Sequence, residues 1–295
     1  MIRCGGRPLR LARSILAASL TVALALCLSG VPAIAAEPAP RRVVSLNVCT
    51  DQLAMLVAGE GQLHSVSFLA RDPGTSAMAA EAQRYVINHS QAEEIFLMQP
   101  DLVLAGTFSS RPTIDLLRRL GFRVEEFAPA RSFDDMRENL TRVGRLLHRE
   151  VKAAELVAEL DGGLAGLRAA KVPRRTIALY DANSYTSGTG TLTDAIFRAA
   201  GLTNIAEKLG VAGTVRLPME LLIMADPDLI AASNRDYGAP ALAQENFTHP
   251  AYLALGAQER IVNVPVPNMI CGGPFTLEAA RILQEAASMP IGKVK

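Results

Sequence analysis

One thirteen-residue segment occurs twice in this chain. Residues 93–105 read EEIFLMQPDLVLA and residues 220–232 read ELLIMADPDLIAA, and the two align without a gap. Each copy predicts a short apolar helix, a Pro-Asp stop and a buried strand, because proline cannot continue a helix and the next run has the length of a parallel strand. The spacing is too wide for a solenoid. The pattern therefore predicts two lobes built to one plan, which present Glu93 and Glu220 at matching positions.

Strands and helices alternate on both sides of the middle of the chain. Apolar strands are expected near 42–46, 63–67, 102–105 and 123–127, and again near 176–180, 229–232 and 261–264. Such alternation favours parallel sheets that are covered by helices on both faces. Between the halves, residues 149–170 are rich in helix-forming residues, although Gly162 and Gly163 weaken the later part. The predicted fold class is α/β, with two similar lobes and parallel-rich sheets joined by one long backbone helix.

The first 36 residues have the features of a secretory signal peptide. Four arginines precede an apolar run from Ile15 to Leu28, and the small residues that follow suit cleavage after Ala35 or Ala36. The alternatives are a retained membrane anchor, for which the run is short, and a lipid-modified Cys27. We expect an exported protein with a cleaved signal peptide at 1–36, an N-terminal lobe at 37–148, a connecting helix at 149–170 and a C-terminal lobe at 171–295.

Charge and cysteine content narrow the classes of partner. Residues 1–36 hold four arginines and no other charged side chain, which leaves 26 basic and 29 acidic residues and a net charge of −3 with histidine neutral. This balance argues against binding to nucleic acid. After the signal peptide only Cys49 and Cys271 remain, and two such cysteines often pair in an oxidising compartment. A disulfide would join the lobes, whereas the alternative is two small buried thiols.

Several further segments occur in a fixed order along the chain. RVVSLN at 42–47 opens the first lobe, YTSGTGTL at 185–192 lies in the second, and CGGP at 271–274 precedes the last helix. With the repeated element, these segments make the chain resemble the periplasmic solute-binding proteins of the helical-backbone class, which serve vitamin B12, ferric-siderophore and haem ABC importers. The resemblance covers essentially the whole chain after residue 36.

The resemblance implies a receptor and not an enzyme. Such a receptor binds a metal chelate in the cleft between its lobes and delivers it to the permease dimer of an ABC importer in the inner membrane. It implies a monomer that needs no cofactor of its own. The chain has no Trp, which weakens the case for cobalamin and leaves ferric chelates, haem or another metal complex open.

In this family the repeated glutamates dock onto arginines of the permease, and the resemblance transfers that role to Glu93 and Glu220. A rigid pair of carboxylates suits bidentate pairing with guanidinium groups. The alternative is that each carboxylate only stabilises the N-terminus of its helix. Glu94 competes with Glu93, because a slip of one residue would exchange them.

Ligand-binding residues are expected in the loops at the carboxyl ends of the strands, where the lobes would face each other. Polar and aromatic side chains mix in these loops, which suits a large ligand with polar edges. The candidates in the first lobe are Asn47, Cys49, Thr50, Arg71, Asn88, His89 and Phe108. The candidates in the second lobe are Tyr185, Thr186, Ser187, Arg235, Tyr237, Asn268 and Cys271.

Two other classes of function stay open. A receptor for a bare ion such as zinc or manganese would need about three His and a carboxylate, but no pair among His64, His89, His148 and His249 has ligand spacing. We therefore expect no metal site built by the protein alone. An enzyme would need a catalytic motif, and no nucleophile elbow, His-Glu-x-x-His or long phosphate loop occurs. Cys49 with His89 or His64 is the remaining catalytic candidate.

Overall fold

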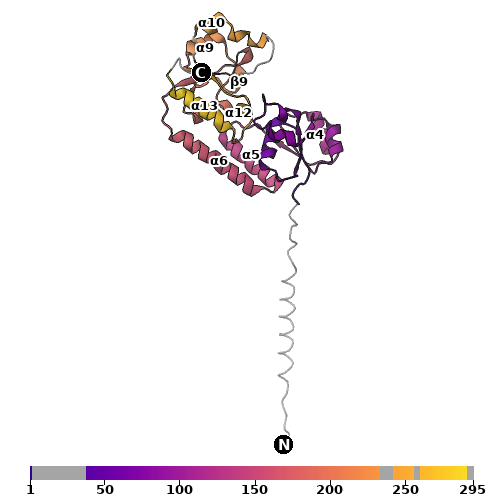
Figure 1. The fold of residues 1–295 in the computed structure, drawn as a ribbon. Coiled ribbons are helices and arrows are strands. Elements are labelled where there is room, and N and C mark those ends of the chain that lie inside the picture. The colour runs from indigo at the N-terminus through magenta and orange to yellow at the C-terminus, as the bar shows by residue number, and fades with distance from the viewer. Residues whose placement is uncertain (2–37, 233–241, 256–259, 291–295) are drawn as a thin grey trace. The chain divides into compact units, whose positions relative to one another are not determined.

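The structure is a computed structural model that describes Met1 and residues 38–232, 242–255 and 260–290 (Figure 1). The chain divides into two units, Met1–Pro38 and Ala39–Lys295, and the fold below is that of the second unit. The predicted signal peptide and two predicted ligand-binding residues, Arg235 and Tyr237, lie outside the described residues. Within the described ranges, no helix has the length and apolar character needed to cross a bilayer.

The first lobe is a five-stranded parallel sheet with helices on both faces. Its strand order is β3-β2-β1-β4-β5. Successive residues of a strand point to opposite faces, so Val43 and Leu104 pack against the helices of one face while Val44 and Val103 pack against those of the other. The elements in chain order are β1 (Val43–Ser45), α2 (Val48–Val57), β2 (Leu63–Ser67), η1 (Phe68–Arg71), η2 (Glu81–Arg84), β3 (Val86–Asn88), α3 (Ala92–Met98), β4 (Leu102–Gly106), α4 (Arg111–Arg119) and β5 (Val124–Phe127).

The second lobe repeats this plan. Its parallel sheet has the order β11-β10-β6-β8, which corresponds to β5-β4-β1-β2 of the first lobe, and β7 and β9 form a separate antiparallel pair. The predicted α/β class with two lobes of one plan is therefore confirmed. The elements are β6 (Thr176–Leu179), η3 (Ala182–Ser184), β7 (Tyr185–Ser187), α7 (Leu192–Ala199), β8 (Thr203–Asn204), α8 (Ile205–Lys208), β9 (Thr214–Arg216), α9 (Met219–Ala225), β10 (Leu229–Ala232), η4 (Leu242–Phe247), α10 (Pro250–Ala254), β11 (Ile261–Asn263), α12 (Pro267–Ile270) and α13 (Thr276–Ser288).

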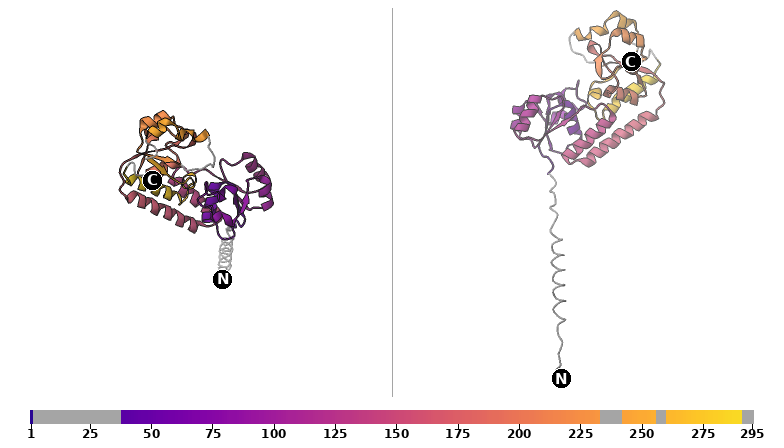
Figure 2. Two further views of the ribbon diagram at one scale, coloured as in Figure 1. Left: turned by 45° about the horizontal axis from the view of Figure 1, so that its top comes forward. Right: turned by 180° about the vertical axis from the view of Figure 1, so that it is seen from behind.

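Two helices connect the lobes, α5 (Phe133–Leu147) and α6 (Glu150–Ala169). Helix α6 is the predicted backbone helix, and α5 lies beside it (Figures 1 and 2). Leu140 of α5 and Leu156 of α6 pack in the first lobe's core, whereas Met136 of α5 and Leu160 of α6 pack in the core of the second. Helices α5 and α6 form a helical hairpin, and each of them belongs to both cores. The connection is therefore stiffer than one helix alone would make it.

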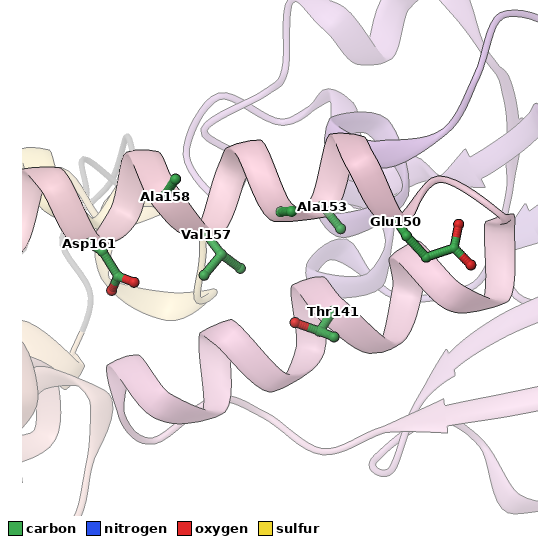
Figure 3. A pocket seen from close by; sticks show the side chains of 7 residues that line it. Thr141, Glu150, Ala153, Val157, Ala158 and Asp161 are labelled. Carbon is green, nitrogen blue, oxygen red and sulfur yellow. The ribbon is translucent and has the colours of Figure 1, made fainter.

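Glycines permit two close contacts of this hairpin. A Cβ on Gly144 would lie 2.4 Å from the Cβ of Ala153, and a Cβ on Gly163 would lie 2.3 Å from Cδ1 of Leu277 on α13. The neighbouring Gly162 has nothing within 4 Å of its Cβ position. Small side chains also line a groove of about 310 Å³ between α5 and α6 (Figure 3). Because only residues of these two helices line the groove, it is separate from the ends of the strands.

The two copies of the repeated segment adopt the same local structure. Helices α3 and α9 both end at a left-handed residue, Gln99 with φ 48° and Asp226 with φ 42°. Pro100 and Pro227 follow directly, and the chain then enters β4 or β10. The left-handed residue turns the chain out of the helix, and proline cannot continue that helix.

The aspartates of the repeat perform the same task in both lobes. The Asp101 carboxylate accepts hydrogen bonds from the backbone N–H groups of Arg41 at 2.6 Å and Arg42 at 2.9 Å. Asp228 accepts one from the backbone N–H of Thr176 at 2.7 Å and one from the hydroxyl of Thr176 at 2.9 Å. Each aspartate thus fixes the start of its lobe's first strand, β1 or β6. The Pro-Asp pair therefore has a structural role in each lobe, which explains why it occurs twice.

Candidate functional site

Three exposed rings follow the carboxyl ends of strands β2, β3 and β4 of the first lobe, in whose sheet β1 lies between β2 and β4. Phe68 comes directly after β2, His89 directly after β3, and Phe108 two residues after β4. Phe68 is 51% exposed and Phe108 83% exposed. The rings of Phe68 and His89 stack with their centroids 5.7 Å apart. Since parallel strands end at one edge of a sheet, the three rings give this edge an apolar, aromatic surface that suits a ligand.

A carboxylate holds the ring of His89. Its Nδ1 lies 2.9 Å from Oε1 of Glu94, and Oε2 of Glu94 accepts the backbone N–H of His89 at 2.6 Å. The backbone hydrogen bond from His89, followed by the side-chain hydrogen bond, lowers the pKa of Glu94. Within the described ranges no further hydrogen bond reaches the imidazole, so Nε2 is the ring nitrogen left for a ligand.

The second lobe presents Tyr185 in the segment that follows β6. Tyr185 lies in β7 opposite Arg216 of β9, and it is 41% exposed. The Arg216 guanidinium lies 5.6 Å from the centre of the tyrosine ring, a cation–π distance. This side of the candidate site therefore combines an aromatic face with a positive charge.

A disulfide joins Cys49 to Cys271, with the two Cα atoms 5.1 Å apart. Cys49 lies in the first turn of α2, just after β1, and Cys271 lies between β11 and α13. The bond therefore links the carboxyl end of a first-lobe strand to the segment between α12 and α13 of the second lobe. Because both sulfurs are used, two buried thiols are excluded, and Cys49 cannot act as a catalytic nucleophile while the bond is intact.

A hollow of about 400 Å³ lies next to Phe108. Arg131 and Arg142 are among its lining residues. The guanidinium of Arg142 donates to the backbone carbonyl of Glu126 at 2.7 Å and to the carboxylate of Glu125 at 2.8 Å, whereas Arg131 is exposed. Asp135 and Glu138 also line the hollow, so charged side chains of both signs lie beside Phe108.

Several predicted ligand-binding residues lie inside the fold instead, which corrects their assignment to the ligand surface. The hydroxyl of Thr50 lies 2.8 Å from that of Ser45, and the hydroxyl of Thr186 donates to the carbonyl of Leu179. Asn88 donates from its amide to the backbone carbonyl of Ser45 and the hydroxyl of Ser65. The buried candidates are Thr50, Asn88, Thr186, Ser187 and Cys271.

Two other predicted candidates, Arg71 and Asn47, are partly exposed but have structural partners. The guanidinium of Arg71 donates to the backbone carbonyls of Ala82 at 3.3 Å and Tyr85 at 2.8 Å, and so holds the segment before β3. Asn47 caps α2 by accepting the backbone N–H of Cys49 at 3.0 Å. Asn268 is partly exposed in α12, close in sequence to the disulfide.

The buried Asp51 holds the backbone next to Phe68 through hydrogen bonds. It accepts the backbone N–H of Ser67 at 3.1 Å and the Ser67 hydroxyl at 2.5 Å. Burial raises the pKa of Asp51 to about 6, and the hydrogen bonds from Ser67 oppose that rise. Ser67 directly precedes Phe68, so Asp51 fixes the backbone from which the ring projects. Sequence reasoning missed both Asp51 and Phe68, although Phe68 follows the end of a predicted strand.

The two repeated glutamates occupy equivalent positions. Glu93 and Glu220 are exposed in the first turns of α3 and α9. Across the described part of the chain, neither carboxylate accepts a hydrogen bond, whereas Glu94 is bonded to His89. Glu220 also borders a hollow of about 360 Å³ that His249 helps to line. Of the two adjacent glutamates in α3, Glu94 is thus bonded to His89, whereas the carboxylate of Glu93 has no hydrogen-bond partner among the described residues.

The histidines lie apart from one another. His148 is the left-handed C-cap of α5, and His249 caps α10 by accepting the backbone N–H of Ala251. Partial burial, together with the charge of Arg42, lowers the pKa of His64. No group of three or more His, Cys, Asp or Glu that could hold a metal ion occurs among the residues that the structure describes. This part of the chain thus offers no support for a bare-ion receptor.

Sequence comparison places the chain among known binding proteins. A profile described as Periplasmic binding protein matches residues 43–257. A protein of Halobacterium salinarum named cobalamin-binding protein is 30% identical over 225 residues, which is 71% of this chain. The matched region spans 59% of that relative's own length.

Solved structures of the same fold come from several bacteria. A periplasmic heme binding protein from Pseudomonas aeruginosa has a TM-score of 0.66 at 19% identity, covering 84% of this chain and 93% of the other. The periplasmic vitamin B12 binding protein BtuF of Vibrio cholerae has a TM-score of 0.61 at 19% identity, covering 84% and 96%. These likenesses show a shared fold. Because the profile covers well over half of the sequence, the chain belongs to the periplasmic binding protein family.

Proposed function

We propose that this protein is the periplasmic receptor of an ABC importer and binds a metal chelate between its two lobes. The observation that carries the proposal is the aromatic surface of Phe68, His89 and Phe108, which lies at the sheet edge that the disulfide links to the second lobe. Ligands of α/β proteins bind outside the carboxyl ends of the strands. The family is one of binding proteins, and no catalytic role is proposed.

The side chains around this edge suit a flat, rigid ligand with charged margins. Phe68 and Phe108 offer ring faces, Arg131 and Arg216 offer positive charge, and Nε2 of His89 offers a nitrogen for a metal centre. Haem has all of these features, cobalamin shares the macrocycle and the metal centre, and ferric siderophores share a metal centre with polar edges. Cobalamin is the first to test, because the relative from Halobacterium salinarum is named for it.

The proposed partner is the permease dimer of the importer. Glu93 and Glu220 would each pair with an arginine of one permease subunit, because an exposed and unpaired carboxylate is suited to a guanidinium. A protein of this family acts outside the inner membrane, so we further propose that residues 1–36 are an export signal that is removed.

The ligand is tested by titration of the purified protein with cyanocobalamin, hemin and ferrichrome in parallel. We expect submicromolar binding of one of them, and a loss of about 10-fold or more for Phe108→Ala because a stacking face is removed. Phe122→Ala is a matched control, since Phe122 is partly buried and packs against Phe96 and the core cluster beneath α3 and α4. Two results together would exclude the metal-chelate class. None of the three ligands would bind, and protein purified from its own periplasm would contain no iron, cobalt or haem.

Docking is tested by reversal of the charges of both glutamates. We expect Glu93→Arg with Glu220→Arg to abolish uptake in cells that depend on this importer, while the affinity for the ligand is unchanged. The control is Glu60→Arg with Glu159→Arg, two exposed glutamates outside α3 and α9 that change the net charge equally. Full uptake by the double reversal would show that these carboxylates do not dock.

A further inference from the structure

In each lobe, the most exposed large apolar side chain of the helix follows the unpaired glutamate by one turn. Leu97 of α3 is 79% exposed, and Met224 of α9 is 80% exposed. Leu97 follows Glu93 by four residues and Met224 follows Glu220 by four, so the two are aligned partners in the repeat. Residues four apart lie on the same face of a helix, one turn from each other.

Packing within the lobes does not explain these side chains. The buried positions of the same helices are taken by Ile95 in α3 and Leu222 in α9, and both are fully buried. Single exposed apolar residues are common on protein surfaces and need no explanation. A long apolar side chain beside a free carboxylate, at the same position in both lobes, is a feature of the repeated plan.

We propose that Leu97 and Met224 are apolar contacts for the permease, which would bury each of them next to the ion pair made by Glu93 or Glu220. This inference rests on the proposed function. An apolar side chain beside an ion pair keeps water away from it, and charge pairs attract more strongly where water is excluded. Met and Leu are flexible enough to fit a shallow pocket.

Charge selects the partner among the surfaces that could cover these residues. A second copy of this chain would bring carboxylate against carboxylate, and an anionic lipid surface would repel both glutamates. A membrane protein with two equivalent sites, each with a guanidinium beside an apolar hollow, would bind both apolar patches at once. The patches are Leu97 with Glu93 and Met224 with Glu220. A two-fold permease dimer has two such equivalent sites.

The test measures docking of the intact exported protein to the importer's permease in phosphatidylcholine nanodiscs, as a dissociation constant at several salt concentrations. We expect Leu97→Gln with Met224→Gln to weaken docking by about 100-fold, or roughly 10-fold per site. The salt dependence should stay that of the native protein, because no charge is changed. Glu93→Gln with Glu220→Gln should weaken docking and flatten the salt dependence.

The control variant is Val151→Thr, which changes a side chain that is 76% exposed on α6. It should dock with native affinity, and all variants should unfold at the native temperature. Native affinity for the Leu97→Gln and Met224→Gln pair, with weakened docking of the glutamate pair, would overturn the apolar contact and leave the docking proposal in place. Native affinity for both pairs would overturn docking itself.

Two further outcomes would assign the apolar patches to another surface and so overturn the inference. In one, the native protein binds to nanodiscs that contain no permease, and the Leu97→Gln and Met224→Gln pair does not. The other is a native dimer in sedimentation that becomes a monomer in the same variant. We expect a monomer that does not bind to empty nanodiscs.

Discussion

The carboxyl group of Asp51 gives the first lobe a stability that depends on pH. Its pKa is about 6 in the folded protein, because burial disfavours the charge, whereas an aspartate exposed to solvent in the unfolded chain has a pKa of 3.8. The folded state therefore keeps a proton between these values that the unfolded state has lost, so the free energy of unfolding falls as the pH rises from about 4 to 6.5. The full effect is about 3 kcal/mol as an order of magnitude.

We expect Asp51→Asn to remove this slope, because the amide cannot ionise. The measurement is urea unfolding at pH 4.5 and pH 7.5 for the native and variant proteins. Asp115→Asn serves as the control, since Asp115 is exposed on α4. An unchanged pH slope in Asp51→Asn would show that another group carries the effect.

Substitutions of the adjacent Glu93 and Glu94 should affect ligand binding and permease docking separately. We expect Glu94→Gln to lower ligand affinity by roughly 3- to 10-fold, because His89 loses the charged group that fixes its ring. Glu93→Gln should keep ligand affinity and weaken docking to the permease. Titration with whichever of cyanocobalamin, hemin and ferrichrome the native protein binds, and docking to permease nanodiscs, give the two readouts. If both substitutions affect the same readout, the two glutamates do not have separate roles.

At the level of elements, two neighbouring glycines of α6 have opposite surroundings. Gly162→Ala should raise the free energy of unfolding by roughly 0.5–1 kcal/mol, because alanine favours the helix and its Cβ meets nothing within 4 Å. Gly163→Ala should lower it by roughly 1–3 kcal/mol, because its Cβ would lie 2.3 Å from the side chain of Leu277. Chemical denaturation of both variants is the measurement. Equal effects would mean that α13 gives way at this contact.

Strong periodicity explains why most elements could be predicted from the sequence. Apolar runs and Pro-Asp stops predicted the central strands, and composition predicted α6 to within one residue at each end. Strand β8 has only two residues, Thr203 and Asn204, too few for a pattern. The participation of α5 in the second core depends on Met136, a long-range contact that local sequence does not reveal.

The site was less predictable for a different reason. The rule that ligands lie after parallel strands selected His89 and Phe108, whose side chains are exposed in the structure. It also selected Thr50 and Asn88, because sequence alone does not tell a polar side chain that faces a ligand from one bonded inside the fold. Burial decides between these, and burial depends on three-dimensional packing.

For the whole molecule, the disulfide should contribute strongly to stability. We expect the exported protein to show no free thiol in denaturant without reductant, and reduction to lower the free energy of unfolding by about 2–5 kcal/mol. Cys49→Ser with Cys271→Ser should match the reduced native protein. Thiol counting and denaturant unfolding give the two measurements. Two free thiols, or no effect of reduction, would contradict this expectation.

The bond between Cys49 and Cys271 also closes most of the polypeptide into a covalent ring, since the two residues are 222 positions apart. A protease that cuts the backbone once at any point inside this ring opens it without releasing a fragment. The nicked receptor therefore stays one molecule, with both pieces still held at the edge where the ligand would bind. Only reduction would let the pieces separate, so a cut that is silent on a non-reducing gel appears as two bands on a reducing one.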